Sequence, residues 1–564
     1  MNKLIGRVLA TEKHPTTMDK FSFWTNSDLK LNAFDIVKVE HIDQSFSFGV
    51  IENISHITDA QSFLTNFISS DFGDLEIDEP TLRVGMNYAE AKISFNDGNW
   101  YTPVHNNAKV YLATAEEIIF ALGLKDIENP LVCGSLKMYE GTEDEVVLPV
   151  NLNSKFILGP EGAHLNISGI SGLAAKTSYA MFLMKAIQDQ NLENSITNDD
   201  DSVAFVIFNV KGKDLMAIDQ ENDFADSPSG DKEATIEDYS ILGLSEQPFQ
   251  NVKYFIPFSE KSSAKQSTYL SRDEVANYLE YRYLRKYKYI YSDDKENIEM
   301  MFSNIDDPAQ TMESIISKII DEEDQDFNNL STWDDFTEKI AEKSQRGAAG
   351  DKNDISVLSW RKFKRVVRKA LQDEMFANGV DVSKKECRLA DELKQIKKND
   401  VCVVDIAKLP EDKQAFVFGN VVRTIYNLKL GEYDAELETS PPTRIVIFID
   451  ELNKYASKDV PKTSPILREI LDVTERGRSL GVVLFAAEQF RSAIHDRVTG
   501  NCATHAYGRT NSIETTSRDY SSLPSTYKNM LTRLEQGDYL IQNPVFRSLL
   551  KIRFPKPIYK QFKS

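Results

Sequence analysis

The stretch that decides the fold is AHLNISGISGLAAKTS, residues 163–178. It begins as an apolar strand and runs into a helix-compatible segment that starts at Lys176. Between the two, Gly169 and Gly172 allow backbone N–H groups to turn inward, which is how a loop at a helix N-terminus binds phosphate groups. A second strand-like run, VAFVIFNV at 203–210, follows the helix. Strand, turn, helix and strand at this spacing predict a βαβ unit and therefore a parallel sheet.

The loop also carries a lysine and hydroxyls in a familiar order. In the pattern GxxxxGK[ST], the lysine neutralises phosphate charge and the next hydroxyl can hold Mg²⁺. Here Ala175 stands where glycine is usual, and six residues rather than five separate Gly169 from Lys176. A glycine-rich turn with a chance lysine is the alternative interpretation. The predicted nucleotide-binding residues are Gly169, Ser171, Gly172, Ala175, Lys176, Thr177 and Ser178.

A second segment, RIVIFIDE at 444–451, ends an apolar strand with two adjacent carboxylates. In phosphate-loop enzymes the first carboxylate can hold the Mg²⁺ shell and the second can position the attacking water. The alternative is a pair of acids that merely begins a loop, but coincidence with a lysine-bearing phosphate loop favours the functional interpretation. We therefore predict Thr177 and Asp450 as metal ligands and Glu451 as the residue that activates water.

Cationic and amide side chains further along complete the candidate site. ERGR at 475–478 ends a helix that begins near Ser464, and AAEQ at 486–489 ends the next strand. An arginine from a neighbouring subunit can stabilise charge on the transferred phosphate, and a glutamine at a strand end can sense it. Favourable placement of cations at a helix C-terminus is the alternative. The further catalytic candidates are Arg478, Arg476, Gln489 and Arg509, the last in the strand-like ATHAYGRT.

Patterning along the chain indicates more than one structural unit, as 564 residues also require. Short alternating apolar runs near the N-terminus predict a small β-barrel or sandwich. Near-continuous apolar runs later in the chain are typical of strands buried on both faces. GDYLIQNP and FRSLLKIRFP predict a β-hairpin that leads into a short exposed tail. The predicted organisation is a barrel at 1–75, linker strands and a short helix at 76–150, and an α/β domain at 151–564 with a helical insertion at about 216–395.

One segment of the insertion is strongly amphipathic. Trp360, Phe363, Val367 and Ala370 fall on one face of a predicted helix. Cations cover the rest, and a solvated helix face explains them, with a DNA-facing or subunit-facing surface as the alternative. These cations are Arg361, Lys362, Lys364, Arg365, Arg368 and Lys369.

Composition restricts the classes of function. The 66 basic and 87 acidic residues give a net charge of −21, so a bound nucleic acid would need a locally basic channel. The four cysteines form no CxxC pair or Cys/His cluster, which argues against structural zinc and a disulfide framework. Since no stretch approaches the roughly 18 apolar residues that span a bilayer, we expect no membrane association and a cytoplasmic location.

Taken together, the segments resemble HerA-like ATPases of the HerA/FtsK class over nearly the whole chain. LIGRVLATE and FSFGVIENI resemble the small N-terminal barrel of that family, the HAS-barrel, and AHLNISGISGLAAKTS and IFIDELNKY resemble its Walker A and Walker B segments. FNVKGKDL, VVDIAKLP and ERGRSLGVVLFAAEQ resemble further family segments. The resemblance implies an α/β, RecA-like P-loop NTPase domain. It also implies hexameric rings that bind ATP and Mg²⁺ between subunits and move double-stranded DNA through a central pore.

The AAxKTS form of the loop resembles HerA-like proteins of bacterial anti-phage defence systems. That resemblance implies an effector partner, either a sirtuin-like NADase or a nuclease, which docks on the N-terminal barrel. Three hypotheses follow: a ring-forming ATPase motor, a nucleotide-stabilised scaffold that turns ATP over slowly and activates the effector, and a DNA-binding protein with vestigial ATP chemistry. The acidity of the chain counts against the third.

Overall fold

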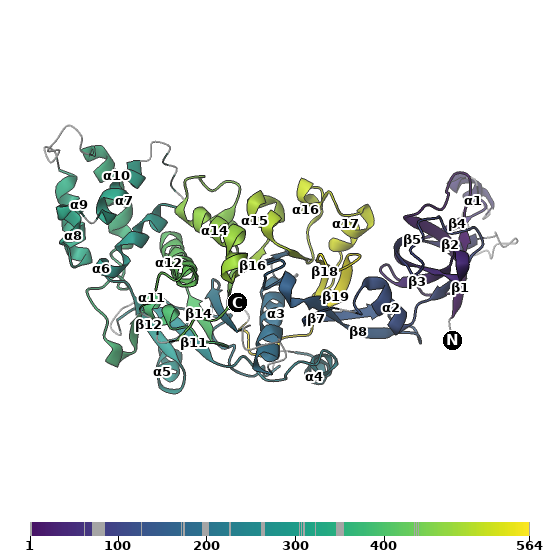
Figure 1. Cartoon of the computed structure of the whole chain (residues 1–564), viewed down its shortest axis with the longest axis horizontal. Coiled ribbons are helices and arrows are strands. Elements are labelled where there is room, and N and C mark those ends of the chain that lie inside the picture. Colours follow the sequence, from purple (N-terminus) through teal and green to yellow (C-terminus); the bar gives the residue numbers. More distant parts are fainter. Residues whose placement is uncertain are drawn as a thin grey trace.

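The computed structural model describes residues 3–562 except 27, 61, 70–84, 126, 171, 173–174, 194–201, 225–226, 261–265, 304, 306, 308–310, 322, 346–354, 434, 436 and 438. The molecule is elongated, with a β-barrel at one end, a group of helices at the other and a large sheet between them (Figure 1). Among the described residues, none of the helices has the length and apolar character needed to cross a bilayer.

The N-terminal unit is a closed barrel with the strand order β1-β2-β5-β4-β3-β6. The predicted small barrel is therefore confirmed, but it continues past residue 75. Two strands that we assigned to a linker, β5 and β6, close it by pairing with β2 and β4 and with β1 and β3. A closed barrel has no unpaired strand edge, and without β5 and β6 the remaining strands could not close. The strands are β1 (Leu4–Leu9), β2 (Lys20–Thr25), β3 (Ile36–Glu40), β4 (Phe46–Thr58), β5 (Gly85–Asn96) and β6 (Lys109–Leu112).

The second unit is built on a 13-stranded sheet with the order β13-β12-β11-β14-β10-β15-β16-β9-β17-β18-β19-β7-β8. Strands β13 to β17 along this order are parallel, and the rest pair antiparallel, so the predicted α/β domain with a parallel sheet is confirmed. The C-terminal hairpin is β18 and β19. The strands outside the insertion are β7 (Pro130–Met138), β8 (Val146–Asn153), β9 (Leu165–Ser168), β10 (Val203–Asn209), β14 (Val401–Asp405), β15 (Arg444–Asp450), β16 (Val482–Glu488), β17 (Thr504–Tyr507), β18 (Asp538–Gln542) and β19 (Leu550–Arg553).

Two apolar cores cover the opposite faces of this sheet. Phe205 and Ile207 of β10 belong to one core, while Val206 and Phe208 belong to the other. Alternate side chains of a strand point to opposite faces, so a strand between two cores must be apolar at every position. One face is covered by α3 (Lys176–Leu192), and the other by α12 (Glu411–Leu430) and α14 (Pro465–Leu480).

The segment predicted as a helical insertion also contributes strands, and this corrects the prediction. β11 (Val252–Pro257), β12 (Leu284–Lys288) and β13 (Glu386–Arg388) extend the sheet beyond β14. β12 reads LRKYK and β13 reads ECR, which are short and charged and carry no strand signal of their own. Their pairing depends on the edge of β11, and Lys288 and Glu386 form an ion pair of 2.7 Å between them.

The helices of the insertion between Tyr291 and Ala370 form the end of the molecule opposite the barrel (Figure 1). Trp360 stacks on Phe327 with ring centroids 5.7 Å apart, and Phe363 stacks on Phe302 at 4.9 Å. The predicted apolar face, Trp360 to Ala370, is buried as expected. The helices are α6 (Tyr291–Asp294), α7 (Thr311–Ile320), α8 (Gln325–Asn328), α9 (Trp333–Lys343) and α10 (Val357–Ala370).

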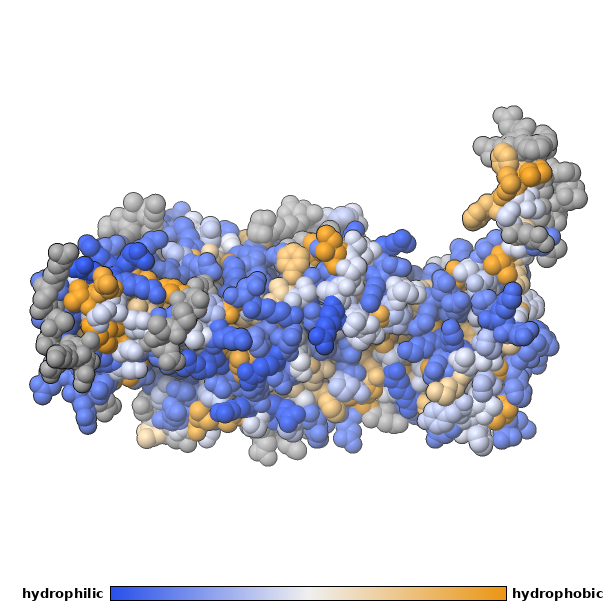
Figure 2. Space-filling model, turned by 90° about the horizontal axis from the view of Figure 1, so that it is seen from above, coloured by the Kyte–Doolittle hydropathy of each residue, from blue (hydrophilic) through white to orange (hydrophobic). Residues whose placement is uncertain are grey.

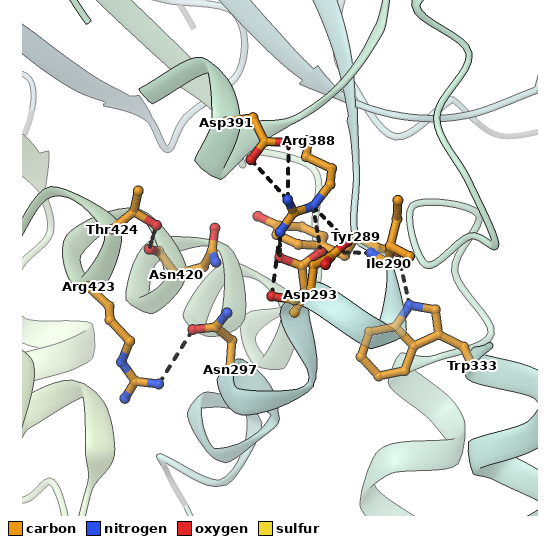
Figure 3. A network of polar contacts seen from close by, with 11 residues as sticks. Tyr289, Ile290, Asp293, Asn297, Trp333, Arg388, Asp391, Asn420, Arg423 and Thr424 are labelled. Atoms are coloured by element: carbon orange, nitrogen blue, oxygen red, sulfur yellow. Dashed lines mark hydrogen bonds and ion pairs between the residues drawn. The ribbon is translucent and has the colours of Figure 1, made fainter. Parts of the chain in front are cut away.

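Polar contacts fix these helices to the sheet (Figure 3). Arg388, at the end of β13, lies 3.1 Å from Asp294 of α6 and 2.9 Å from Asp391. The indole Nε1 of Trp333 donates a hydrogen bond of 2.9 Å to the backbone oxygen of Tyr289. Arg388 is the last residue of β13 and Tyr289 directly follows β12. These contacts therefore join α6 and α9 to the edge of the sheet.

Candidate nucleotide-binding site

Two described residues of the segment between β9 and α3 have left-handed backbone conformations. Ala175, which directly precedes α3, has φ of 50°, in the left-handed region that costs a non-glycine residue about 1–2 kcal/mol. Gly172 has φ of 79°, and apart from its chain neighbours no atom of the described residues lies within 4 Å of the position where a Cβ would be. Ala175 thus takes a left-handed conformation at a position where glycine is usual. Ser171, predicted to bind nucleotide, lies outside the described residues.

Lys176 begins α3 and points back across the loop. Its Nζ donates a hydrogen bond of 3.0 Å to the backbone oxygen of Gly169, and the side chain is buried. Burial lowers the pKa of the Lys176 ammonium, although the nearby carboxylate of Asp450 acts in the opposite direction. A cation held in a poorly solvated loop interacts strongly with an incoming anion, which suits a phosphate-binding lysine.

The two predicted metal ligands lie side by side. Thr177 Oγ1 donates a hydrogen bond of 2.9 Å to Asp450 Oδ2, so α3 and the end of β15 meet at this point. Hydroxyl and carboxylate oxygens suit Mg²⁺, which binds few protein ligands and keeps water and substrate phosphate oxygens in its shell. The described part of the chain contains no group of three or more His, Cys, Asp or Glu side chains that could hold a metal ion.

Glu451 follows β15 and is held between two lysines. Its Oε1 lies 2.9 Å from Lys211 Nζ and its Oε2 lies 2.6 Å from Lys454 Nζ. Lys211 Nζ also lies 3.6 Å from Asp450 Oδ2. Burial alone would raise the pKa of Glu451, but the hydrogen bonds from the two lysines lower it below its ordinary value. Glu451 is therefore ionised, as a base must be, while both its oxygens are already in ion pairs.

Gln489 and Arg509 reach the same edge of the sheet as the phosphate loop. Gln489 directly follows β16, whose last residue, Glu488, pairs with Ser168 of β9. The backbone N–H of Ile170 in the loop donates a hydrogen bond of 2.8 Å to the backbone oxygen of Arg509. Both predicted residues are thus neighbours of the loop, as a sensing role requires.

Ser178 faces a different part of the chain. Its hydroxyl donates a hydrogen bond of 3.0 Å to Oε1 of Gln561 in the C-terminal tail. The tail is not an exposed appendage, because Ile558 and Tyr559 are buried and the ring of Phe562 lies 4.4 Å from Lys213 Nζ. Gln561 therefore lies beside the first turn of α3, and the prediction of an exposed tail is wrong for residues 558–559.

Arg476 and Arg478 lie far from the phosphate loop of their own chain. They are exposed in the last turn of α14, and β16 begins directly after that helix. The loop is at the other end of β16, which is seven residues long and spans about 20 Å. Arg478 instead donates a hydrogen bond of 3.5 Å to the backbone oxygen of Glu161. The structure therefore does not bring Arg476 or Arg478 to the phosphate loop of their own chain.

Sequence reasoning missed two ionisable residues near the site. Lys211 lies just beyond β10, in the segment FNVKGKDL, and its place after a parallel strand could have indicated it. Glu488 is fully buried, and among the described residues neither of its carboxylate oxygens has a hydrogen-bond partner. Burial raises the pKa of Glu488 to about 8, so its carboxyl is protonated at neutral pH. Nothing in the run VVLFAAEQ distinguishes this buried acid from an exposed one.

Comparison with known proteins gives only remote similarities. No protein-family model and no curated protein sequence matches the chain. Among solved structures, the bacterial conjugative coupling protein TrwB lacking its N-terminal segment is 11% identical, with a TM-score of 0.40, over 73% of this chain and 89% of that one. VirB4 of Thermoanaerobacter pseudethanolicus is 11% identical, with a TM-score of 0.41, over 76% and 97%. The genome packaging NTPase B204 of Sulfolobus turreted icosahedral virus 2, in complex with ATP-gammaS, is 17% identical, with a TM-score of 0.22, over 32% and 78%.

Proposed function

We propose that this chain is a P-loop ATPase that binds Mg-ATP at the edge formed by β9, β15 and β16. The observation that carries the proposal is the contact of Thr177 with Asp450, beside Lys176 and Glu451, in residues that lie some 270 positions apart in sequence. Lys176 and the loop N–H groups bind the phosphates. Mg²⁺, held by Thr177 and Asp450, supplies charge neutralisation when bound. Glu451 accepts the proton of the attacking water.

Steady-state ATP hydrolysis by the purified chain tests this function, with Lys176→Ala and Glu451→Gln as variants. We expect turnover in the wild type, loss of both binding and turnover in Lys176→Ala, and retained binding without turnover in Glu451→Gln. A wild type that binds no ATP in the presence of Mg²⁺ would refute the proposal. A different experiment is needed to test whether the chain forms a ring.

We further propose that the chain acts as a homo-hexameric, HerA-type ring in which Arg478 or Arg476 of one subunit enters the ATP site of the next. The position of both arginines, remote from their own site, supports action between subunits. Mixing Lys176→Ala subunits with Arg478→Ala subunits tests it, because a mixed ring contains some sites with both intact groups. We expect partial recovery of turnover, and none if each site is complete within one chain. A ring of this kind could move double-stranded DNA through its pore.

A second candidate function is a nucleotide-stabilised scaffold that organises and activates an effector in anti-phage defence. Two observations favour slow turnover: Ala175 stands in a left-handed conformation, and both oxygens of Glu451 are paired with lysines. If the scaffold is correct, Glu451→Gln leaves activation of the effector intact, while Lys176→Ala weakens it. If a motor drives the function, both substitutions abolish it.

We propose that the effector, a sirtuin-like NADase or a nuclease, docks on the N-terminal barrel. Large apolar side chains are exposed there, with Phe63 97% and Leu64 64% accessible on α1 (Phe63–Ser69), and Figure 2 shows hydrophobic residues on the projection at this end. Co-purification with the double variant F63S/L64S tests it. Leu358→Ser, a change at a 74% exposed leucine of the helical end, is the control. Loss of the effector with F63S/L64S alone is expected, and undiminished binding would contradict docking here.

A further inference from the structure

A strongly basic hollow lies between α9 and α10, at the end of the molecule away from the barrel. Its volume is about 570 Å³. Five of the described residues that line it are cations, and none of the described lining residues is acidic or aromatic. In a chain with a net charge of −21, this is a local reversal of charge. We call it the α10 basic hollow, lined by Ala341, Ser344, Gln345, Arg361, Lys364, Arg365, Arg368, Lys369 and Gln372.

Packing fixes which way the cations face. Trp360, Phe363 and Val367 are each no more than 1% exposed, so α10 cannot rotate about its axis without breaking the core beneath it. The cations at 361, 364–365 and 368–369 follow each other at helical i, i+3 and i+4 spacing, on one side of the helix. With a rise of 1.5 Å per residue they cover about 12 Å, which matches three to four successive phosphates of one nucleic-acid strand at 3.4 Å each.

Among the described residues, the cations of the hollow have no carboxylate partners, unlike the cations around them. On α9, Lys339 and Lys343 are paired with Asp326 at 2.8 and 2.5 Å, and Lys362 of α10 lies 3.9 Å from Asp307. For the five cations of the hollow, no described carboxylate lies within 4.0 Å. Like charges three and four positions apart on a helix repel each other, so this arrangement weakens α10 unless an anion is bound.

We propose that the α10 basic hollow binds the phosphate backbone of duplex nucleic acid. The absence of aromatic side chains among its described lining residues removes the stacking surface on which single strands depend. The row of guanidinium and ammonium groups suits phosphates without reading base edges, so binding is independent of sequence. The site is separate from the ATP site and does not depend on the function proposed above.

Fluorescence anisotropy with a labelled 30-base-pair DNA duplex tests the proposal, measured at several salt concentrations. The test variant is Arg365→Gln/Arg368→Gln, and the matched control is Lys339→Gln/Lys343→Gln, which removes two charges from the same helical end outside the hollow. At low salt we expect the Kd of the test variant to rise at least about tenfold, and the slope of log K against log salt to fall by about two. The control should stay within about twofold of the wild type. ATP turnover without DNA should be unchanged in both.

Several results would overturn the proposal. Equal weakening by both double variants would mean that only overall charge matters. A single-stranded oligonucleotide bound as tightly as the duplex would contradict the assignment to duplex backbone. Unchanged duplex binding, combined with a smaller oligomer in size-exclusion chromatography of the test variant, would assign the hollow to an acidic protein face. If the double variant fails to fold, Arg365→Gln and Arg368→Gln alone are each expected to lower the salt slope by about one.

Discussion

Lys211 provides the sharpest test of the site, because the nearer of its two carboxylate partners is Glu451, the proposed base of the ATPase reaction. Its Nζ lies 2.9 Å from Glu451 Oε1, and the side chains of Lys211 and Glu451 are 35% and 14% exposed. At an effective dielectric constant of about 20, Coulomb attraction at this distance is about 6 kcal/mol before desolvation. Because Lys211 is partly solvated, and exposed pairs contribute at most about 1 kcal/mol, we expect a net effect of about 1–3 kcal/mol.

Lys211→Met removes this charge but keeps the length of the side chain. Each 1.36 kcal/mol changes a pKa by one unit, so the pKa of Glu451 should rise by about one to two units. Glu451 accepts a proton only when it is ionised, and in the wild type its pKa lies below the ordinary value of 4.5. Activity therefore stays constant well into the acidic range in the wild type. In Lys211→Met, the acidic limb of the pH–kcat profile should move upward by about one to two units.

The assay is ATP turnover from pH 5 to pH 9 at saturating Mg-ATP. Lys213→Met is the matched control, because Lys213 lies in the same segment but pairs with Glu274 at 2.5 Å. We expect its profile to match the wild type. An acidic limb that does not move in Lys211→Met, while Glu451→Gln abolishes turnover, would refute the idea that Lys211 sets the pKa of the catalytic carboxylate.

Three further substitutions test other parts of the structure. Glu488 has a folded-state pKa of about 8 against an ordinary 4.5, so the native state binds the extra proton and stability is lost as the pH rises between these values. Glu488→Gln should remove this loss, which is at most about 5 kcal/mol, in urea unfolding compared at pH 5 and pH 8.5. Ala175→Gly should relieve the strain of the left-handed alanine and raise the free energy of unfolding by up to about 1 kcal/mol. A free energy of unfolding below that of the wild type would contradict the idea that Ala175 is strained. Phe363→Ala should lower the free energy of unfolding by about 3–5 kcal/mol in the same assay. A decrease below about 1 kcal/mol would mean that packing of Phe363 does not hold α10 in place.

The sequence by itself determined the parts that depend on local order. A βαβ unit needs only strand, loop and helix in succession, so the segment around Lys176 predicted the phosphate loop and a parallel sheet. Apolar runs that end in acids predicted Asp450 and Glu451, because parallel strands carry their functional residues at their carboxyl ends. The sequence also predicted the buried face of α10, because apolar residues at helical spacing lie on the side of a helix that packs against the core.

Only the tertiary structure decided features that join distant segments. β12 and β13 become strands by pairing with edges that other parts of the chain provide, and their own sequences are too short and too charged to indicate it. β5 and β6 were expected as strands, but their place in the barrel follows only from their pairing with β1, β2, β3 and β4. Lys211 contacts Glu451 because β10 and β15 are adjacent in the sheet. The order of the strands in the sheet determines this contact. The same strand order places Arg478 at the opposite end of β16 from the phosphate loop. Hydrogen bonding between strands is not local in sequence, so these relations follow from the folded sheet and not from any motif.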